Sequence, residues 1–136
     1  MRFLEENDAH TPESWVILEI LTKQSTVVYK VFGMWSGGYL HGDSWRMNSG
    51  IDKMEEDDKH YSFIGFSGST YICKKGSYRI NGYGGSVLKG IVNDYKERGH
   101  TAIIIPTEEE AIKALKFLDD PTWRSMNVYD DTDRVY

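Results

Sequence analysis

The sequence predicts an α+β fold, in which an antiparallel sheet of about six strands is covered on one face by two helices from the C-terminal half. Short apolar segments rich in β-branched residues recur at roughly ten-residue spacing through the first half, with glycine and serine turns between them. The second half carries two segments of helical periodicity on either side of one short apolar segment. Strands followed by helices in this order favour α+β over an alternating α/β arrangement.

The strands of the first half are placed by apolar alternation and by the turns that interrupt it. Gln24-Ser25 and Ser36-Gly-Gly38 are such turns, and Ser67-Gly-Ser69 is another. Neighbouring strands joined by turns this short pair in an antiparallel way. The predicted strands cover residues 15–23, 27–35, 43–48, 51–55, 61–66 and 70–74.

The second half predicts a helix, a buried strand and a second helix. An apolar stripe over 86–98 predicts an amphipathic helix that Gly99 terminates. Residues 101–105 predict a buried strand, which Pro106 ends. Thr107 and Glu110 then form a capping box that begins the second helix, which extends to about Leu118.

The length of 136 residues fits one domain that can bury its own core. We expect a polar arm at 1–14, a globular domain at 15–118 and an acidic tail at 119–136. No apolar run approaches the roughly 18 residues that span a bilayer, and the N-terminus lacks a secretory signal, so no membrane association is expected. With Cys73 as the single cysteine, a reducing intracellular compartment is the simplest expectation.

The net charge of −5 argues against general nucleic-acid binding, which clustered positive charge drives. It does not argue against one small anionic ligand, because the middle of the chain is relatively basic. The glycine-rich stretch NGYGGSVLKGI, residues 81–91, leads into the first predicted helix. It matches neither the Walker A loop nor the dinucleotide fingerprint, since Val87 stands where the third glycine is needed.

Two interpretations of this stretch remain open. It is a flexible connector between sheet and helix, or its first-turn N–H groups at Gly84, Gly85 and Ser86 assist an anion site. Hydroxyl, aromatic and cationic side chains, the types that grip phosphate and stack on bases, precede it. These candidate ligand-binding residues are Trp45, Arg46, Asn48, Ser67, Ser69, Tyr71, Lys74, Lys75, Tyr78 and Arg79, although a polar hairpin facing solvent explains the residues from Ser67 onward equally simply.

Catalytic patterns are weaker. The histidines at 10, 41, 60 and 100 lack metal-ligand spacing, and Cys73 has no partner at zinc-site spacing, so neither a metal nor a cofactor is expected. No nucleophile elbow surrounds Ser67 or Ser69. An acid-base role for His41 or His60 remains the enzymatic alternative.

The segments Trp45-Arg-Met-Asn-Ser-Gly-Ile51 and Gly65-Phe-Ser-Gly-Ser-Thr-Tyr-Ile-Cys-Lys74, with Glu55-Glu-Asp57 between them and Ser77-Tyr78 after them, resemble small accessory proteins of tailed bacteriophages. The resemblance covers roughly residues 15–98. It implies action inside the infected cell, in the host cytoplasm, on host machinery or host defence. The resemblance does not identify any catalytic residue.

Together, these features favour a non-catalytic protein that sequesters a nucleotide-derived host immune signal. A homo-oligomer would help to enclose the ligand, although the sequence specifies no interface. The first alternative is an inhibitor that binds a host protein through a sheet edge or the acidic surface. The second alternative is an enzyme that degrades a nucleotide signal.

Overall fold

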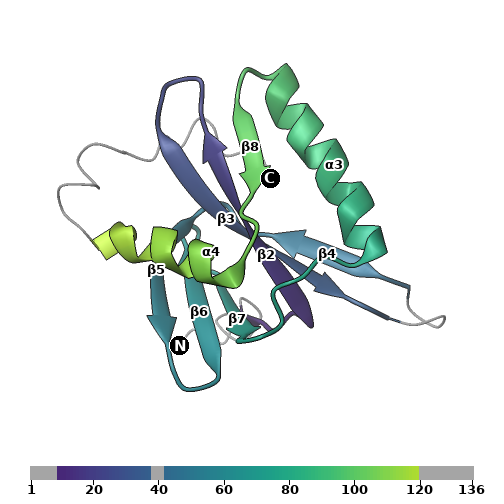
Figure 1. Cartoon of the computed structure of the whole chain (residues 1–136), viewed down its shortest axis with the longest axis vertical. Coiled ribbons are helices and arrows are strands. Elements are labelled where there is room, and N and C mark those ends of the chain that lie inside the picture. Colours follow the sequence, from purple (N-terminus) through teal and green to yellow (C-terminus); the bar gives the residue numbers. More distant parts are fainter. Residues whose placement is uncertain (1–8, 38–41, 120–136) are drawn as a thin grey trace.

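The structure, a computed structural model, describes residues 9–37 and 42–119. This part of the chain forms two four-stranded sheets, two α-helices and a short 3₁₀ helix (Figure 1). In chain order the elements are β1 (Ala9–His10), β2 (Ser14–Leu21), β3 (Val27–Trp35), β4 (Ser44–Met47), β5 (Ile51–Glu56), β6 (His60–Gly65), β7 (Thr70–Lys74), α3 (Gly82–Glu97), β8 (Thr101–Ile104), α4 (Glu108–Leu115) and η1 (Lys116–Asp119).

The α+β class and the six predicted strands are confirmed, but their arrangement in one sheet is wrong. The strands divide into the sheet β1-β7-β6-β5, called sheet A here, and the sheet β4-β3-β2-β8, called sheet B. Two strands join the six. The strand predicted at 101–105 is β8, which lies at the edge of sheet B beside β2, and the prediction that it is buried is wrong because Ile103 is 49% exposed. The other strand is β1, which pairs in parallel with β7 from within the predicted arm. All other ladders are antiparallel.

The division between the sheets falls just after β4. Asn48 continues the pairing of β4 with β3, since its backbone N–H donates to the Val31 carbonyl oxygen at 3.2 Å. Gly50 then adopts φ of +146°, a conformation that side chains oppose, and the chain leaves sheet B. Because the chain turns away there, β5 pairs with β6 instead of extending the first sheet.

The middle strand β2 is buried on both faces over residues 15–18, where its sequence is a continuous apolar run. Trp15 and Ile17 face one core, which sheet A and α4 complete. Val16 and Leu18 face the other core, which α3 covers. The two helices therefore lie on opposite faces of sheet B, where the sequence predicted them on one face.

Both helices begin at a side-chain cap. Asn81 caps α3, accepting the Gly84 N–H at 2.6 Å, and Thr107 caps α4, accepting the Glu110 N–H at 3.1 Å. The first helix thus begins at Gly82, one turn earlier than the predicted Ser86. The glycine stretch belongs to the helix and is not a hinge before it.

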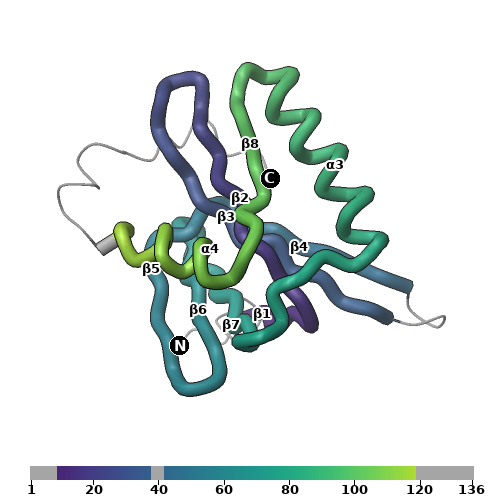
Figure 2. The backbone as a smooth tube through the Cα atoms, viewed as in Figure 1, coloured from purple at the N-terminus to yellow at the C-terminus, as the bar shows by residue number. Residues whose placement is uncertain are grey.

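The segment between β7 and α3 runs from sheet A to the face of sheet B that α3 covers (Figure 2). It is fastened to Trp15 by two backbone hydrogen bonds, Trp15 N–H to the Ser77 carbonyl and Arg79 N–H to the Trp15 carbonyl, each of 3.2 Å. A single parallel bridge between Trp15 and Tyr78 results. This connection fixes Tyr78 and Arg79 at the junction of the two sheets.

Neither α3 nor α4 combines the length and apolar character needed to cross a bilayer, and no other helix of that kind occurs in residues 9–37 and 42–119. The predicted tail lies outside the described residues, except for Asp119 at the end of η1.

Candidate functional site

The predicted ligand-binding residues do not converge on one place. Trp45 and Arg46 are neighbours on β4 and therefore face opposite sides of sheet B. Trp45 stacks on Phe32 on the side that α3 covers, with 5.3 Å between ring centroids. Arg46 lies on the other side, where its charge acts on the Tyr71 hydroxyl. The tryptophan and the arginine cannot grip the same ligand.

Tyr71 and Asn48 lie in the interior. Tyr71 is 1% exposed, and its ring contacts that of His10 at 4.9 Å. Burial raises the pKa of the Tyr71 hydroxyl to about 12. Asn48 is 2% exposed, and its Oδ1 accepts the Val31 N–H at 3.0 Å. The Tyr71 ring is therefore not accessible for stacking on a base, and the Asn48 side-chain oxygen is already used in a hydrogen bond within sheet B.

Ser67 and Ser69 lie in the turn between β6 and β7, at the opposite end of β7 from Lys74. The Ser69 carbonyl oxygen accepts the Gly65 N–H at 2.8 Å and closes this turn. Lys74 is exposed, and its carbonyl oxygen accepts the indole N–H of Trp15 at 2.8 Å. The serines are thus about 16 Å from Lys74 along an extended strand of five residues, too far to share a small ligand.

The predicted backbone donors of the glycine stretch are engaged inside α3. The Gly84 N–H is held by the Asn81 side chain, and the Gly85 N–H donates to the Asn81 carbonyl oxygen at 2.9 Å. Ser86 is exposed in the second turn. The N-terminal end of α3 carries the partial positive charge of the helix dipole, and no acidic residue in its first turn offsets this charge. The first turn of α4, by contrast, contains three glutamates.

Tyr78 and Arg79 are the two predicted residues that line a common hollow, called the Arg79 groove here. Its volume is about 240 Å³, and its walls are mostly apolar. Val16 and Ile104 come from β2 and β8 of sheet B, and Ile80 immediately precedes the cap of α3. The full lining is Val16, Tyr78, Arg79, Ile80, Ile104, Ile105 and Pro106.

Tyr78 forms a rigid wall of this groove. Its hydroxyl donates to the Ile105 carbonyl oxygen at 2.5 Å and accepts the Ile17 N–H at 3.1 Å. Burial raises the pKa of the Tyr78 hydroxyl to about 12, so the group is neutral at physiological pH. With both hydrogen bonds made inside the protein, the phenol contributes its ring to the groove and not its hydroxyl.

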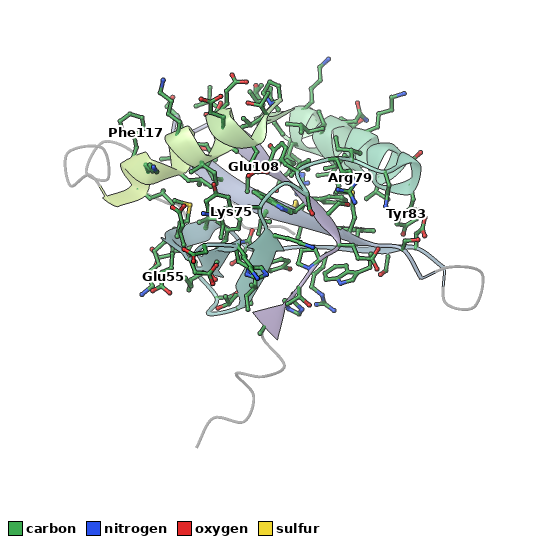
Figure 3. The ribbon with its side chains drawn as sticks, turned by 60° about the horizontal axis from the view of Figure 1, so that its bottom comes forward. Glu55, Lys75, Arg79, Tyr83, Glu108 and Phe117 are labelled. Carbon is green, nitrogen blue, oxygen red and sulfur yellow. The ribbon has the colours of Figure 1, made fainter. Side chains whose placement is uncertain are left out.

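Arg79 supplies the charge of the groove. Its side chain is exposed, and Figure 3 shows it between α4 and the N-terminal end of α3, where Tyr83 is labelled. Glu108, also labelled, accepts the Gly76 N–H at 3.0 Å and so is anchored by that loop. A guanidinium beside an uncompensated helix N-terminus attracts an anionic group.

A larger hollow of about 690 Å³ lies between α4 and β6, called the α4 groove here. Its charged lining residues are Glu108, Glu109, Lys113 and Lys116, and none of the predicted ligand-binding residues takes part. Two carboxylates against two ammonium groups leave no net attraction for an anion. We therefore regard the smaller Arg79 groove as the candidate site.

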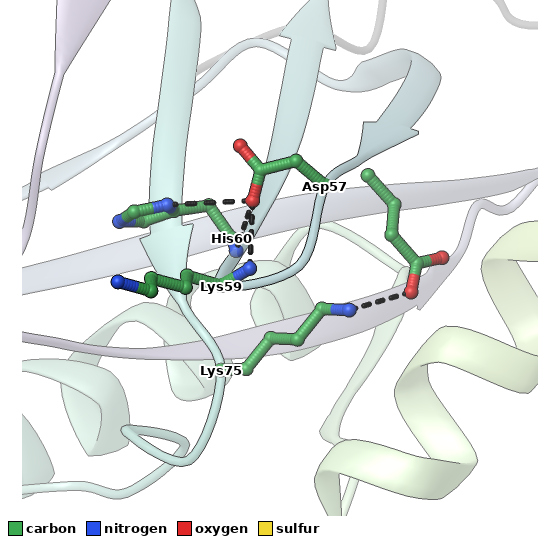
Figure 4. A network of polar contacts seen from close by, with 5 residues as sticks. Asp57, Lys59, His60 and Lys75 are labelled. Carbon is green, nitrogen blue, oxygen red and sulfur yellow. Dashed lines mark hydrogen bonds and ion pairs between the residues drawn. The ribbon is translucent and has the colours of Figure 1, made fainter.

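His60, suggested for catalysis, and Lys75, a predicted ligand-binding residue, have structural partners elsewhere. Asp57 Oδ1 accepts the Lys59 and His60 N–H groups at 2.8 and 2.7 Å, and these bonds lower the Asp57 pKa and close the turn between β5 and β6 (Figure 4). His60 Nδ1 lies 3.5 Å from the same oxygen, and Lys75 pairs with Glu56 at 2.7 Å. None of these residues lines the Arg79 groove.

The other histidine suggested for catalysis, His41, lies outside the described residues. The single cysteine, Cys73, is fully buried, which raises the pKa of its thiol. Within 9–37 and 42–119, no three His, Cys, Asp or Glu side chains gather as metal ligands would.

The apolar walls of the groove escaped the sequence interpretation. One sequence signal was present, since the apolar Ile80 stands between the polar residues Arg79 and Asn81 just before the helix. In the structure Ile80 is 40% exposed. The contribution of Ile104 depends on the pairing of β8 with β2, which no local pattern reveals.

Comparison of the chain with protein-family models, curated proteins and solved structures finds no match.

Proposed function

We propose that this chain is a non-catalytic binding protein that holds a small anionic ligand with a flat apolar part in the Arg79 groove. A nucleotide-derived signal has this chemistry. The proposed role of the protein is to sequester such a signal inside the host cell, in keeping with the resemblance of the chain to bacteriophage accessory proteins. The observation that carries the proposal is one exposed guanidinium at the rim of an otherwise apolar groove, next to a helix N-terminus.

The chemistry of the lining residues suggests which part of the ligand each of them would contact. Arg79 would take the phosphate through paired N–H donors, a geometry that suits phosphate oxygens. Ile80 and Pro106 would contact the apolar face of the base, against the ring of Tyr78. The lining contains no carboxylate, imidazole, thiol or aliphatic hydroxyl, and the Tyr78 hydroxyl is already engaged. These features support binding over turnover.

The test is a binding panel of cyclic dinucleotides and cyclic ADP-ribose isomers, measured by thermal shift and then by calorimetry. Arg79→Ala is expected to weaken binding by about 10-fold to 100-fold, the usual loss for a hydrogen bond to a charged group. Arg46→Ala is the matched control, because it removes an exposed arginine of β4 that does not line the groove. Its affinity is expected to equal that of the unchanged protein.

The two alternatives give different results in the same experiment. Ligand recovered intact after heat denaturation supports sequestration, whereas product recovered by mass spectrometry identifies an enzyme. If no compound of the panel binds, and a host protein is instead captured in stoichiometric amount, the chain is a protein inhibitor. Equal weakening by Arg46→Ala and Arg79→Ala would also contradict the proposed site.

A further inference from the structure

The Arg79 groove offers a ligand a single unit of positive charge. Of the described residues that line it, Arg79 is the charged one. The ion pairs within residues 9–37 and 42–119 do not involve Arg79, so no carboxylate of this part of the chain neutralises the guanidinium. The side chain is also exposed. One positive charge is therefore available to pair with a phosphate.

Two negative charges lie close to the same groove. Its wall includes Pro106, and the first turn of α4 follows with Glu108 and Glu110. Burial is the main cause of the raised pKa of the Tyr78 hydroxyl, and the charges of Glu108 and Glu110 raise this pKa further. Their electric field thus reaches the phenol that forms one wall of the groove.

A second negative charge on a bound phosphate would have no partner here. The first charge pairs with the guanidinium of Arg79. The other lining side chains are apolar, apart from the Tyr78 phenol, whose hydroxyl is already hydrogen-bonded within the protein. An unpaired charge against apolar walls loses hydration without compensation, and the two glutamates repel it. Because desolvation grows with the square of the charge and the attraction to Arg79 only in proportion to it, the singly charged phosphate is favoured.

We infer that the Arg79 groove selects nucleotides whose phosphate carries one negative charge, as in a phosphodiester, over nucleotides with a terminal phosphate. This inference rests on the proposed function and narrows its ligand class. A terminal phosphate carries close to two charges at about pH 8, because its second pKa is about 6. Cyclic nucleotides, in which each phosphate is a diester, would therefore be separated from linear nucleotides of the same base and sugar.

The test compares three probes by calorimetry at about pH 8. They are 3′,5′-cyclic AMP, adenosine 5′-monophosphate and the methyl ester of that monophosphate. The ester is linear but carries one charge, so it separates the effect of charge from that of ring closure. Cyclic AMP and the ester are expected to bind at least about tenfold more tightly than the monophosphate. Binding of the monophosphate as tight as that of the ester overturns the inference, and so does an ester as weak as the monophosphate.

The double variant Glu108→Gln/Glu110→Gln tests the role of the two carboxylates. Glu108 Oε1 accepts the Gly76 N–H and Glu110 Oε1 accepts the Thr107 hydroxyl, each at 3.0 Å. A glutamine amide oxygen accepts the same bonds, so the variant removes charge and keeps the local structure. Its preference for cyclic AMP over the monophosphate is expected to be about threefold smaller than that of the unchanged protein.

Glu109→Gln is the matched control. This glutamate belongs to the same first turn of α4, but its charge is not among those that act on Tyr78. The control is expected to keep the full preference, and a loss as large as that of the double variant would overturn the role of Glu108 and Glu110. If none of the three probes binds the unchanged protein, the proposed function is refuted and the selection with it. If all three bind with equal affinity, the selection alone is refuted.

Discussion

The ring of Tyr78 packs edge-on against the indole of Trp15, with 4.9 Å between centroids and an interplanar angle of 87°. Trp15 is fully buried in β2, and Tyr78 belongs to the segment that leaves sheet A for α3. The Tyr78 hydroxyl reaches past the indole to the backbones of Ile17 and Ile105. One side chain thus joins β2, the end of β8 and the connecting segment, and it forms a wall of the Arg79 groove.

Tyr78→Phe is expected to lower the free energy of unfolding by roughly 1–3 kcal/mol, the range for leaving a buried donor or acceptor unsatisfied. The ring contact with Trp15 remains, so the loss reports the hydroxyl alone. Tyr83→Phe is the control; Tyr83 is 40% exposed and is expected to change stability by less than about 0.5 kcal/mol. Chemical denaturation measures both. Equal effects of the two substitutions would show that the Tyr78 hydroxyl does not hold the junction.

Stability is expected to fall at alkaline pH. Burial raises the pKa values of Tyr71 and Tyr78 from 10.0 to about 12 in the folded protein. A group with a raised folded pKa stabilises fully below its unfolded pKa, and this contribution is lost as pH rises through the folded value. The free energy of unfolding should therefore decline between about pH 10 and about pH 12. Denaturant titrations across this range test the decline, which should be shallower in Tyr78→Phe; an identical slope would contradict the assignment.

Of the four glycines of α3, those at positions 84 and 90 predict opposite outcomes for substitution by alanine. A Cβ on Gly84 would clash with Met34 Sδ and lie 3.0 Å from its Cγ, whereas a Cβ on Gly90 meets nothing within 4 Å. Gly84→Ala is expected to destabilise by roughly 1–3 kcal/mol through overpacking. Gly90→Ala is expected to stabilise by about 0.5–1 kcal/mol through helix propensity. Thermal unfolding of both variants checks the pair, and stabilisation by Gly84→Ala would refute close packing of α3 on β3.

The local elements were predictable because their signals are local. The β-branched and aromatic run from Thr70 to Cys73 indicates β7, in which Tyr71 and Cys73 alternate with less buried residues, and Thr107 with Glu110 marks the start of α4. The same alternation already places Tyr71 inside, although the sequence interpretation counted it as a ligand contact. Asn81 was a capping signal as well, yet the glycines after it suggested a hinge.

The sheet order and the groove depend on contacts between distant residues. Trp15 contacts Tyr78 across more than sixty positions, and β8 pairs with a strand near the start of the chain. Nothing in either segment specifies its partner, because both are apolar or aromatic segments that fit any buried surface. Arg79 was identified from its residue type, but the apolar walls that make it a site come from this long-range pairing.

The most direct measurement of the proposed site is an amide nuclear magnetic resonance titration of the protein with adenosine 5′-monophosphate, a minimal probe that joins one phosphate to one base. The largest shifts are expected at Arg79, Ile80 and Gly82, with smaller ones at Ile104, and Arg79→Ala should abolish them. Shifts centred on Lys113 and Lys116 of the α4 groove would contradict the account, as would the absence of any saturable shift.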